Sequence, residues 1–514
     1  MNGAESLVTT LLESGIDTCF ANPGTSEMHF VAALDQIPGM RCVLGLQENV
    51  VTGMADGYFR MARKPASTLL HCGPGLANGW ANLHNARRAN SAVLNIVGDQ
   101  ATYHRPYDAP LTADTAALAG AVSAWVRTSQ SAADVGRDAA AAAAAARTTP
   151  GQIATLILPS DTSWDAGGVA ARALLVPSAP SIDTLAVDNA ARILRQNRED
   201  VLILLGGECA LPAAQALAWR IANATGATLK YEYVMGRVSR GRGRLPIERV
   251  PYNTDQAITM MASFRHIILV NARPPVGFFA YPGKPSIQYP REAQIHHLSR
   301  VDQHPEAALL ALAEALNAPA VDMPPSPPCP DTATGTPTPE GLAQTIAAVM
   351  PENAIVSDES ISYGRSFYRF THAAAPHEWL SLTGGAIGDG LPVATGAAVA
   401  CGASRRVISL QADGSAMYSL QSLWTQARER LPCTTILLSN RKYKILIGEY
   451  ENVGATPGPT AMGMLDLSNP DLDWVRLATG MGVEAARATT LEQCADLMRQ
   501  SFRQNGPFLI ELMI

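Results

Sequence analysis

The sequence predicts an α/β protein made of doubly wound parallel sheets, and two observations carry that prediction. Short apolar runs that look like buried strands, such as residues 407–410 and 431–438, alternate with helix-like stretches such as 416–428. Each run ends in a turn rich in glycine or acidic residues, as in a sheet built from strand–helix–strand units. At 514 residues with 47% hydrophobic content, the chain is long enough for two or three domains.

Composition excludes several other classes of protein. The net charge of −6 gives no basic footprint for nucleic acid, and we expect the arginine-rich run 230–244 to be a solvated face or loop. No apolar stretch reaches transmembrane length, and the first residues lack the charged and apolar regions of a signal peptide. The eight cysteines show no paired spacing, so we expect reduced thiols in a cytoplasmic protein without a membrane partner.

Two linkers divide the chain. Residues 174–181 contain two prolines, and residues 323–339 are so rich in proline that they cannot pair as a strand. We therefore expect domains at 1–172, 182–320 and 340–514. The last strand of the first domain is predicted at 153–158, and parallel strands of the second at 201–207 and 266–270. Gly206 and Gly207 lack the rest of a dinucleotide fingerprint, so the sequence gives little support to nucleotide binding there.

Asp413 and Asn440 are the most informative pair of residues. Each follows a predicted buried strand, and a helix-like stretch lies between them. In a parallel sheet both side chains then lie at the carboxyl edge, where ligands bind. A carboxylate and an amide oxygen beside the free N–H groups of a helix start can bind Mg²⁺ and a diphosphate together. The alternative for an Asp-Gly pair after a strand is an ordinary turn.

The pattern resembles the diphosphate–magnesium motif of the thiamine diphosphate (ThDP) enzymes, with Ala412 and Ser439 in place of the family's first glycine and first asparagine. Segments 21–27, 47–58, 70–75 and 383–392 fall in the order and spacing of benzoylformate decarboxylase and its acetolactate-synthase relatives. The resemblance spans nearly the whole chain. It implies pyrimidine-binding, central and diphosphate-binding domains, in that order.

The resemblance also implies roles for individual residues. Glu48 would drive removal of the C2 proton of ThDP, the Gly385 carbonyl would accept from the aminopyrimidine, and Ile387 would bend the cofactor, although core packing is the other reading of Ile387. The implied Mg²⁺ ligands are Asp413, Asn440 and the backbone carbonyl of Lys442. The remaining implied cofactor contacts are Pro23, Asn78, Ser362, Gly414 and Ser415.

The substrate side of the site departs from the decarboxylase. His71 matches its active-site histidine and Thr25 its carboxylate-binding serine, but Phe278 replaces its second histidine. Ser381 and Glu449 stand where the decarboxylase has aromatic walls, and Glu449 could instead face solvent. We therefore expect poor turnover of benzoylformate, and carboligation that competes well with aldehyde release.

The expected function is decarboxylation of a 2-oxo acid, carboligation of the resulting acyl anion equivalent, or both, with ThDP and Mg²⁺. One alternative is an FAD-containing relative such as acetolactate synthase or pyruvate oxidase. Another is a non-catalytic subunit that retains the fold. The resemblance further implies a homodimer or homotetramer with each site between subunits.

Overall fold

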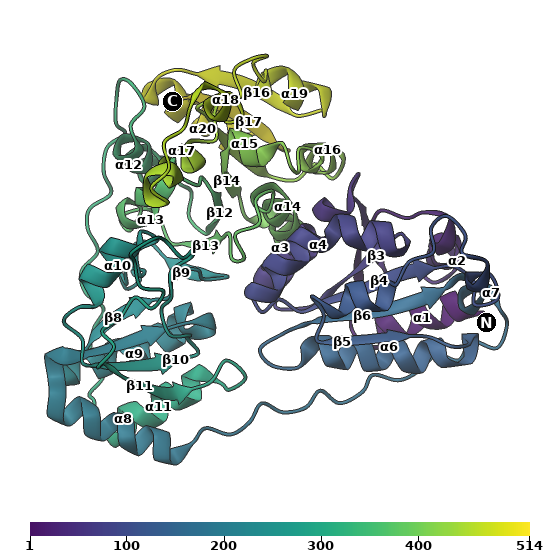
Figure 1. Ribbon diagram of the computed structural model, residues 1–514, viewed down its shortest axis with the longest axis horizontal. Helices are drawn as coiled ribbons and strands as arrows, with labels where there is room; N and C mark the ends of the chain where they lie inside the picture. The colour runs from purple at the N-terminus through teal and green to yellow at the C-terminus, as the bar shows by residue number, and fades with distance from the viewer.

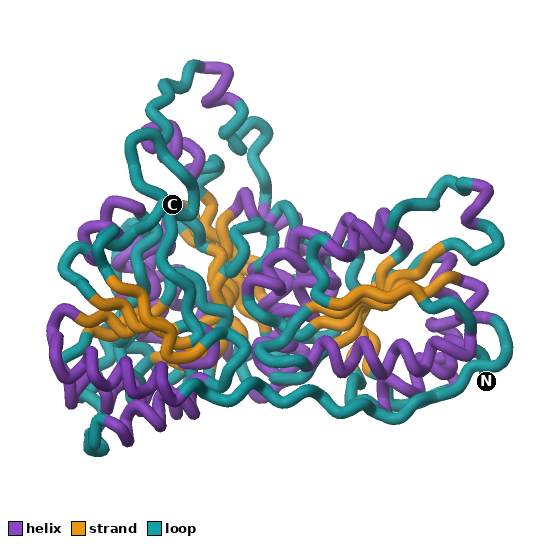
Figure 2. The backbone as a smooth tube through the Cα atoms, turned by 60° about the horizontal axis from the view of Figure 1, so that its bottom comes forward, coloured by secondary structure: helices purple, strands orange, loops and turns teal.

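Three α/β units make up the molecule, as Figure 1 shows. The computed structural model describes residues 1–514, apart from the side chain of Arg198. Each unit is built on its own sheet, in which nearly every pair of neighbouring strands is parallel, and helices cover the sheets (Figure 2). This arrangement confirms the predicted fold class. Within the described chain, no helix is both long and apolar enough to cross a membrane.

The N-terminal unit has a six-stranded parallel sheet in the order β2-β1-β3-β4-β6-β5. The strand predicted at 153–158 is confirmed as β6, the last in sequence. The strands are β1 (Thr18–Ala21), β2 (Arg41–Leu44), β3 (Ala66–Leu70), β4 (Val93–Asp99), β5 (Trp125–Thr128) and β6 (Ile153–Pro159). The helices are α1 (Gly3–Glu13), α2 (Met28–Gln36), α3 (Glu48–Ala62), α4 (Cys72–Arg88), α5 (Thr115–Gly120), α6 (Ala132–Arg147) and α7 (Ser160–Trp164).

The central unit has a four-stranded parallel sheet in the order β11-β10-β7-β8. The two strands predicted there are adjacent and parallel, as expected. The strands are β7 (Val201–Leu205), β8 (Thr228–Tyr231), β10 (His266–Val270) and β11 (Gln294–Ser299). The helices are α8 (Thr184–Asn197), α9 (Pro212–Thr225), α10 (Thr254–Met261) and α11 (Pro305–Ala315). A long segment without regular structure joins the N-terminal unit to α8 (Figure 1).

The C-terminal sheet has seven strands in the order β16-β17-β15-β14-β12-β13-β9. Its strands are β12 (Ala354–Glu359), β13 (His377–Ser381), β14 (Val407–Ala412), β15 (Cys433–Ser439), β16 (Glu484–Ala488), β17 (Phe508–Met513) and β9 (Val238–Arg240). The helices are α12 (Pro339–Val349), α13 (Phe367–Phe370), α14 (Gly390–Cys401), α15 (Asp413–Ala416), α16 (Gln421–Arg428), α17 (Lys444–Asn452), α18 (Pro459–Gly463), α19 (Trp474–Gly480) and α20 (Leu491–Arg503).

The single helix predicted over residues 416–428 is wrong, because the chain forms α15 and α16 with a turn between them. The N–H groups of Tyr418 and Ser422 bond to carbonyls three residues back, at Ser415 and Ser419. Such bonds tighten the backbone and redirect the chain. The turn therefore separates the short helix that begins at Asp413 from the longer one that covers the sheet.

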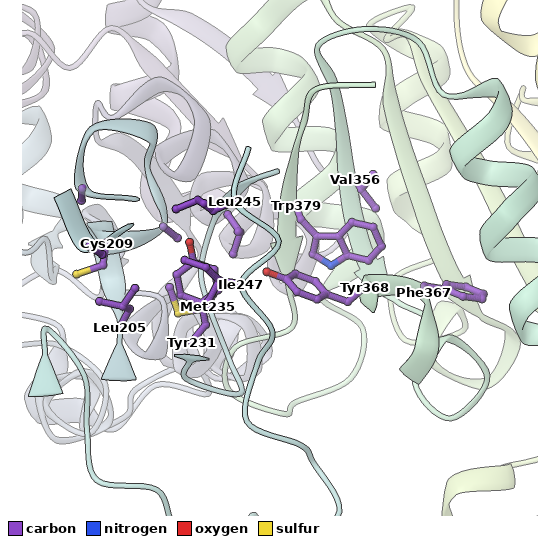
Figure 3. Close-up of a cluster of buried hydrophobic side chains, with 14 of the residues drawn as sticks. Leu205, Cys209, Tyr231, Met235, Leu245, Ile247, Val356, Phe367, Tyr368 and Trp379 are labelled. Atoms are coloured by element: carbon purple, nitrogen blue, oxygen red, sulfur yellow. The ribbon is translucent and has the colours of Figure 1, made fainter. Parts of the chain in front are cut away.

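The expectation that residues 230–244 form a solvated face or loop is wrong for Arg240, which is buried. Arg240 lies on β9, which pairs antiparallel with β13, and only 1% of the residue is exposed. Its guanidinium lies 3.6 Å from the ring centroid of Tyr368 and 5.0 Å from that of Trp379, and it donates to the Tyr368 carbonyl. Aromatic faces compensate part of the cost of burying this cation, and burial lowers the pKa of Arg240 to about 10. Figure 3 shows Tyr368 and Trp379 facing Tyr231, Leu245 and Ile247 of the central unit.

The N-terminal and C-terminal units of one chain meet through α3 and α14. A Cβ added at Gly57 of α3 would lie 2.1 Å from the Val393 carbonyl oxygen, and one at Gly396 of α14 would lie 1.9 Å from the Met54 carbonyl oxygen. The two helices are thus in backbone contact. At the end of α3, Arg60 donates to Asp56 at 2.8 Å and to the Ser381 carbonyl at 2.8 Å. This contact fixes the segment after β13 against the N-terminal unit.

Candidate active site

The N-terminal half of the candidate site lies where β2, β1 and β3 end, because these strands are neighbours in the sheet. The chain after β1 carries Pro23 and Thr25, the chain after β2 leads to Glu48, and His71 directly follows β3. The three residues that the resemblance marks as catalytic therefore lie at the same edge of the sheet. Thr25 is exposed, and His71 is partly exposed.

Glu48 is the first residue of α3 and is 7% exposed. The preceding Gln47 caps the helix, because its side chain accepts from the N–H groups of Asn49 and Val50. The Glu48 carboxylate accepts from Asn78 Nδ2 of α4 at 3.1 Å. Since a nearly buried carboxylate needs hydrogen-bond donors, Asn78 stabilises Glu48 and also determines where it points.

His71 has hydrogen-bond partners that the sequence reasoning missed. Its Nδ1 lies 2.9 Å from a carboxylate oxygen of Glu27 and 3.1 Å from Ser26 Oγ. Glu27 is 2% exposed and also accepts from the Gly24 N–H at 2.7 Å. Both ring contacts are made at Nδ1, so Glu27 and Ser26 orient the imidazole. Glu27 falls within the motif at 21–27, but only the fold brings it across to His71, 44 residues away.

The C-terminal half of the candidate site lies at the carboxyl ends of β12, β13, β14 and β15, which are neighbours. Asp413 directly follows β14 and Asn440 directly follows β15. The two loops are joined, because Asp413 accepts from the Arg441 N–H at 2.6 Å. Within the second loop, Asn440 Oδ1 accepts from the Lys442 N–H at 3.0 Å. Arg441 has a φ of 55°, an unfavourable value for a residue with a side chain, and it forms the turn that directly follows Asn440.

Asp413 has the properties of an anionic ligand. It is 2% exposed, and burial raises its pKa, while the N–H groups of Arg441 and Gly414 lower it in part. No ion pair joins Asp413 to a cationic side chain among those that the structure describes. A bound cation would supply the missing charge, and an oxygen-only donor set suits Mg²⁺. The chemistry of this group thus fits Mg²⁺ held by Asp413, Asn440 and the Lys442 carbonyl.

The remaining predicted cofactor contacts surround this edge. Ser362 follows β12, Ser415 Oγ accepts from Gln411 at 2.8 Å, and Gly414 lies next to Asp413. The loop at 384–388 is held by α4 of the same chain, since Asn85 Nδ2 donates to the Ala386 carbonyl at 2.8 Å. Within this loop Ile387 is half-buried.

Phe278 lies over Gly385. A Cβ at Gly385 would approach Phe278 Cζ to 2.3 Å, and Gly385 has a φ of +82°, so both space and conformation favour glycine there. Tyr252 and Phe279 flank Phe278, with ring centroids at 5.6 and 5.1 Å, and Tyr233 follows at 5.4 Å from Tyr252. The sequence reasoning missed this aromatic group, because its members come from separate loops of the central unit.

The other two predicted pocket residues have well-defined partners. Glu449 on α17 accepts from Tyr281 Oη at 2.7 Å, so it faces the segment that carries Phe278. The solvent-facing alternative for Glu449 is not the arrangement in this structure. Ser381 is 6% exposed, and its hydroxyl accepts from Arg249 at 3.2 Å. Ser381, which stands where the decarboxylase has an aromatic side chain, therefore has the Arg249 guanidinium beside it.

Two family models match the chain. They are described as the N-terminal and C-terminal TPP binding domains of thiamine pyrophosphate enzymes, and they cover residues 1–119 and 362–512. The chain belongs to the thiamine pyrophosphate enzyme family. It is a ThDP-dependent enzyme, and the two matched regions contain the two halves of the candidate site.

Known relatives agree with this assignment. A Mycobacterium tuberculosis protein with the provisional name acetolactate synthase large subunit is 47% identical over 100% of this chain and 99% of its own length. Benzoylformate decarboxylase of Pseudomonas aeruginosa is 29% identical over 98% of this chain and 97% of its own. The structure of a ThDP-dependent 4-hydroxybenzoylformate decarboxylase from Rhodococcus jostii RHA1 superimposes with a TM-score of 0.84 at 26% identity, covering 99% and 98% of the two chains.

Proposed function

We propose that this ThDP enzyme acts on a small or polar 2-oxo acid, and that Mg²⁺ anchors the cofactor through Asp413, Asn440 and the Lys442 carbonyl. The observation that carries the proposal is the joined pair of strand-end loops, in which a buried carboxylate has no cationic partner among the side chains that the structure describes. When bound, ThDP supplies the electron sink that decarboxylation of a 2-oxo acid needs and that no protein side chain provides. The products are an aldehyde or, when a second carbonyl compound accepts the acyl unit, a carboligation product.

The roles of the N-terminal residues follow from their contacts. Glu48 accepts and returns a proton, with its carboxylate held by Asn78. His71 is oriented by Glu27 through Nδ1, which leaves Nε2 to exchange a proton with substrate. Thr25 offers an exposed hydroxyl to the substrate carboxylate. Pro23, Ser362, Gly385, Ile387, Gly414 and Ser415 complete the proposed cofactor contacts.

The proposed site needs two chains. Within one chain, no hydrogen bond or ion pair between described side chains joins Glu48, His71 or Thr25 to Asp413 or Asn440. Large exposed apolar side chains lie on segments beside the C-terminal half, namely Phe278, Phe279, Tyr418, Leu446 and Met462. A second copy that brings its N-terminal half against this surface would cover them and complete the site. We accordingly propose a homodimer or homotetramer.

We also propose a cytoplasmic location, which the eight free thiols support.

The decisive test of cofactor anchoring is the Asp413→Ala variant. Without this carboxylate the charge of the diphosphate and its metal is poorly compensated, so ThDP affinity in the presence of Mg²⁺ should fall at least about a hundredfold, the cost of breaking one buried charge contact. Isothermal calorimetry measures the affinity. Asp496→Ala, which removes a well-exposed acid on α20, should bind normally. Unchanged ThDP affinity in Asp413→Ala would refute the assignment.

The substrate class is tested by product analysis. Benzoylformate, pyruvate and a polar 2-oxo acid are each incubated with the holoenzyme, with and without an aldehyde acceptor. We expect the polar acid to be consumed fastest and to give carboligation product, since Glu449 and the Ser381–Arg249 pair make the surroundings polar. Fast and clean release of benzaldehyde would restore the simple decarboxylase, and the aromatic group around Phe278 would then explain it.

One observation favours the FAD-containing alternative. A cavity of about 420 Å³ lies between the N-terminal and central units, at the carboxyl ends of β7 and β10. Its lining includes Gly207, Asn271 and His304 together with the cations Arg63, Arg147 and Arg237. This volume is near the lower end for ligand sites, and the Arg63–Glu208 ion pair lies at the cavity. Purified protein with a flavin absorption spectrum would establish the FAD-containing alternative.

The other alternative, a non-catalytic subunit, would bind ThDP without consuming any 2-oxo acid.

A further inference from the structure

Two cysteines lie side by side on the first two strands of the N-terminal sheet. Cys19 of β1 and Cys42 of β2 are direct partners in the parallel register. Neighbouring strands are about 4.8 Å apart, within the Cα separation of about 4.4–6.8 Å that a disulfide spans. Their neighbours Phe20 and Val43, also direct partners, belong to the core on the other face. Cys19 and Cys42 therefore share one face of the sheet.

The two thiols differ in accessibility. Cys42 is exposed, because β2 is the edge strand, whereas Cys19 is completely buried in the core beneath α1. The neighbouring Cys19 thiol lowers the pKa of Cys42, and the same proximity together with burial raises the pKa of Cys19. An exposed thiol with a stabilised thiolate is the one that oxidants attack first. Cys19 is positioned to react with the product of that attack.

We propose that Cys19 and Cys42 form an oxidisable dithiol that closes to an intramolecular disulfide when the protein meets a peroxide. The Cys42 thiolate attacks one peroxide oxygen, the O–O bond breaks, and Cys42 becomes a sulfenic acid as hydroxide leaves. The Cys19 sulfur then attacks the Cys42 sulfur, the S–O bond breaks, and the thiol proton leaves with the oxygen as water. In total two thiols lose two electrons and two protons, hydrogen peroxide gains them, and two waters form.

The position of the pair links this modification to the candidate site. Cys19 precedes Thr25 by six residues on the segment that leaves β1, and Cys42 precedes Glu48 by six residues on the segment that leaves β2. A disulfide here would fix the edge strand β2 to β1 at the base of both segments. This inference does not depend on which 2-oxo acid the enzyme uses.

Peptide mapping of the full-length protein tests the proposal. Protein treated with hydrogen peroxide is alkylated, digested with trypsin without reduction, and analysed by mass spectrometry. Trypsin cuts after Arg41, so the disulfide would join peptide 1–41 to peptide 42–60. We expect this linked species, an intact protein lighter by two hydrogen atoms, loss of Cys42 alkylation, and full reversal by dithiothreitol. The oxidised protein should also melt at a higher temperature than the reduced protein, because the crosslink restricts the unfolded chain.

Matched variants separate this pair from general thiol oxidation. Cys42→Ser replaces an exposed residue and should abolish both the linked peptide and the melting shift. Cys329→Ser, which removes another exposed cysteine, should leave both unchanged. The proposal is overturned if peroxide-treated wild-type protein keeps Cys42 fully alkylatable. It is equally overturned if Cys42 proceeds to sulfinic acid without the link, or if Cys42 pairs with a different cysteine.

Discussion

At the scale of single residues, Glu48 combines burial with a hydrogen bond from a side-chain amide. Its carboxylate is 7% exposed and accepts from Asn78. We predict that Glu48→Gln keeps the shape of the site and binds ThDP almost normally, but exchanges the C2 proton of the cofactor about 10²–10⁴-fold more slowly, as expected for loss of a general acid–base group. NMR of acid-quenched samples in D₂O measures this rate. Glu13→Gln, an exposed change in the same unit, should exchange like wild type, and wild-type exchange in Glu48→Gln would remove the residue from its role.

Glu232, which follows β8, gives a prediction about pH. Burial raises the pKa of this carboxyl to about 7, although the N–H of Arg273 donates to it. The folded pKa lies above the unfolded value, so the contribution to stability is complete below about pH 4.5 and is lost as pH rises through 7. We predict that the melting temperature of Glu232→Gln falls less between pH 5 and 8 than that of the wild type. The difference corresponds to a free energy of unfolding of at most about 3 kcal/mol. Glu314→Gln, on the exposed face of α11, should keep the wild-type slope, and an equally steep slope in Glu232→Gln would contradict the assignment.

At the scale of elements, the contact between α3 and α14 determines how the two ThDP-binding units sit within one chain. We predict that Gly57→Ala destabilises the protein by about 1–3 kcal/mol, because the new methyl group meets the Val393 carbonyl and forces two backbones apart. The control is Gly448→Ala on α17, where an added Cβ meets nothing within 4 Å. That change should stabilise by up to about 1 kcal/mol through helix propensity. Thermal melts compare the two variants, and a gain in stability for Gly57→Ala would show that the helices are not in close contact.

The elements also show which parts of the site could be predicted from the sequence. Strand-end residues such as Asp413 and Asn440 follow local patterns, because alternation of apolar runs and turns places them at one sheet edge without knowledge of the rest of the fold. The partners of His71 and Ser381 could not be predicted this way. Glu27 and Arg249 reach them only after strands or whole units have packed. Arg240 looks hydrophilic in sequence, and only the rings of Tyr368 and Trp379, far away along the chain, explain its burial.

At the scale of the whole molecule, the proposed site gives a prediction about assembly. If one chain supplies Glu48 and another Asp413, the smallest active species is a dimer. Light scattering coupled to activity measurement across a dilution series should show activity disappearing with the dimer. Mixing the inactive variants Glu48→Gln and Asp413→Ala should restore activity, because a mixed dimer contains one site with both defects and one with neither. An active monomer, or no restoration by mixing, would contradict sites between subunits.

The pairing of β9 with β13 has a practical consequence for anyone who wishes to divide this protein. The linker at 323–339 looks like the natural place to cut, yet a fragment that starts at residue 340 would lack β9 and would leave β13 as a bare sheet edge. It would also uncover Tyr368 and Trp379, which Arg240 now covers. Unpaired strand edges and exposed aromatic rings promote aggregation. Truncation studies, domain exchange with relatives and split-protein reporters should therefore keep residues 182–514 together as one cassette.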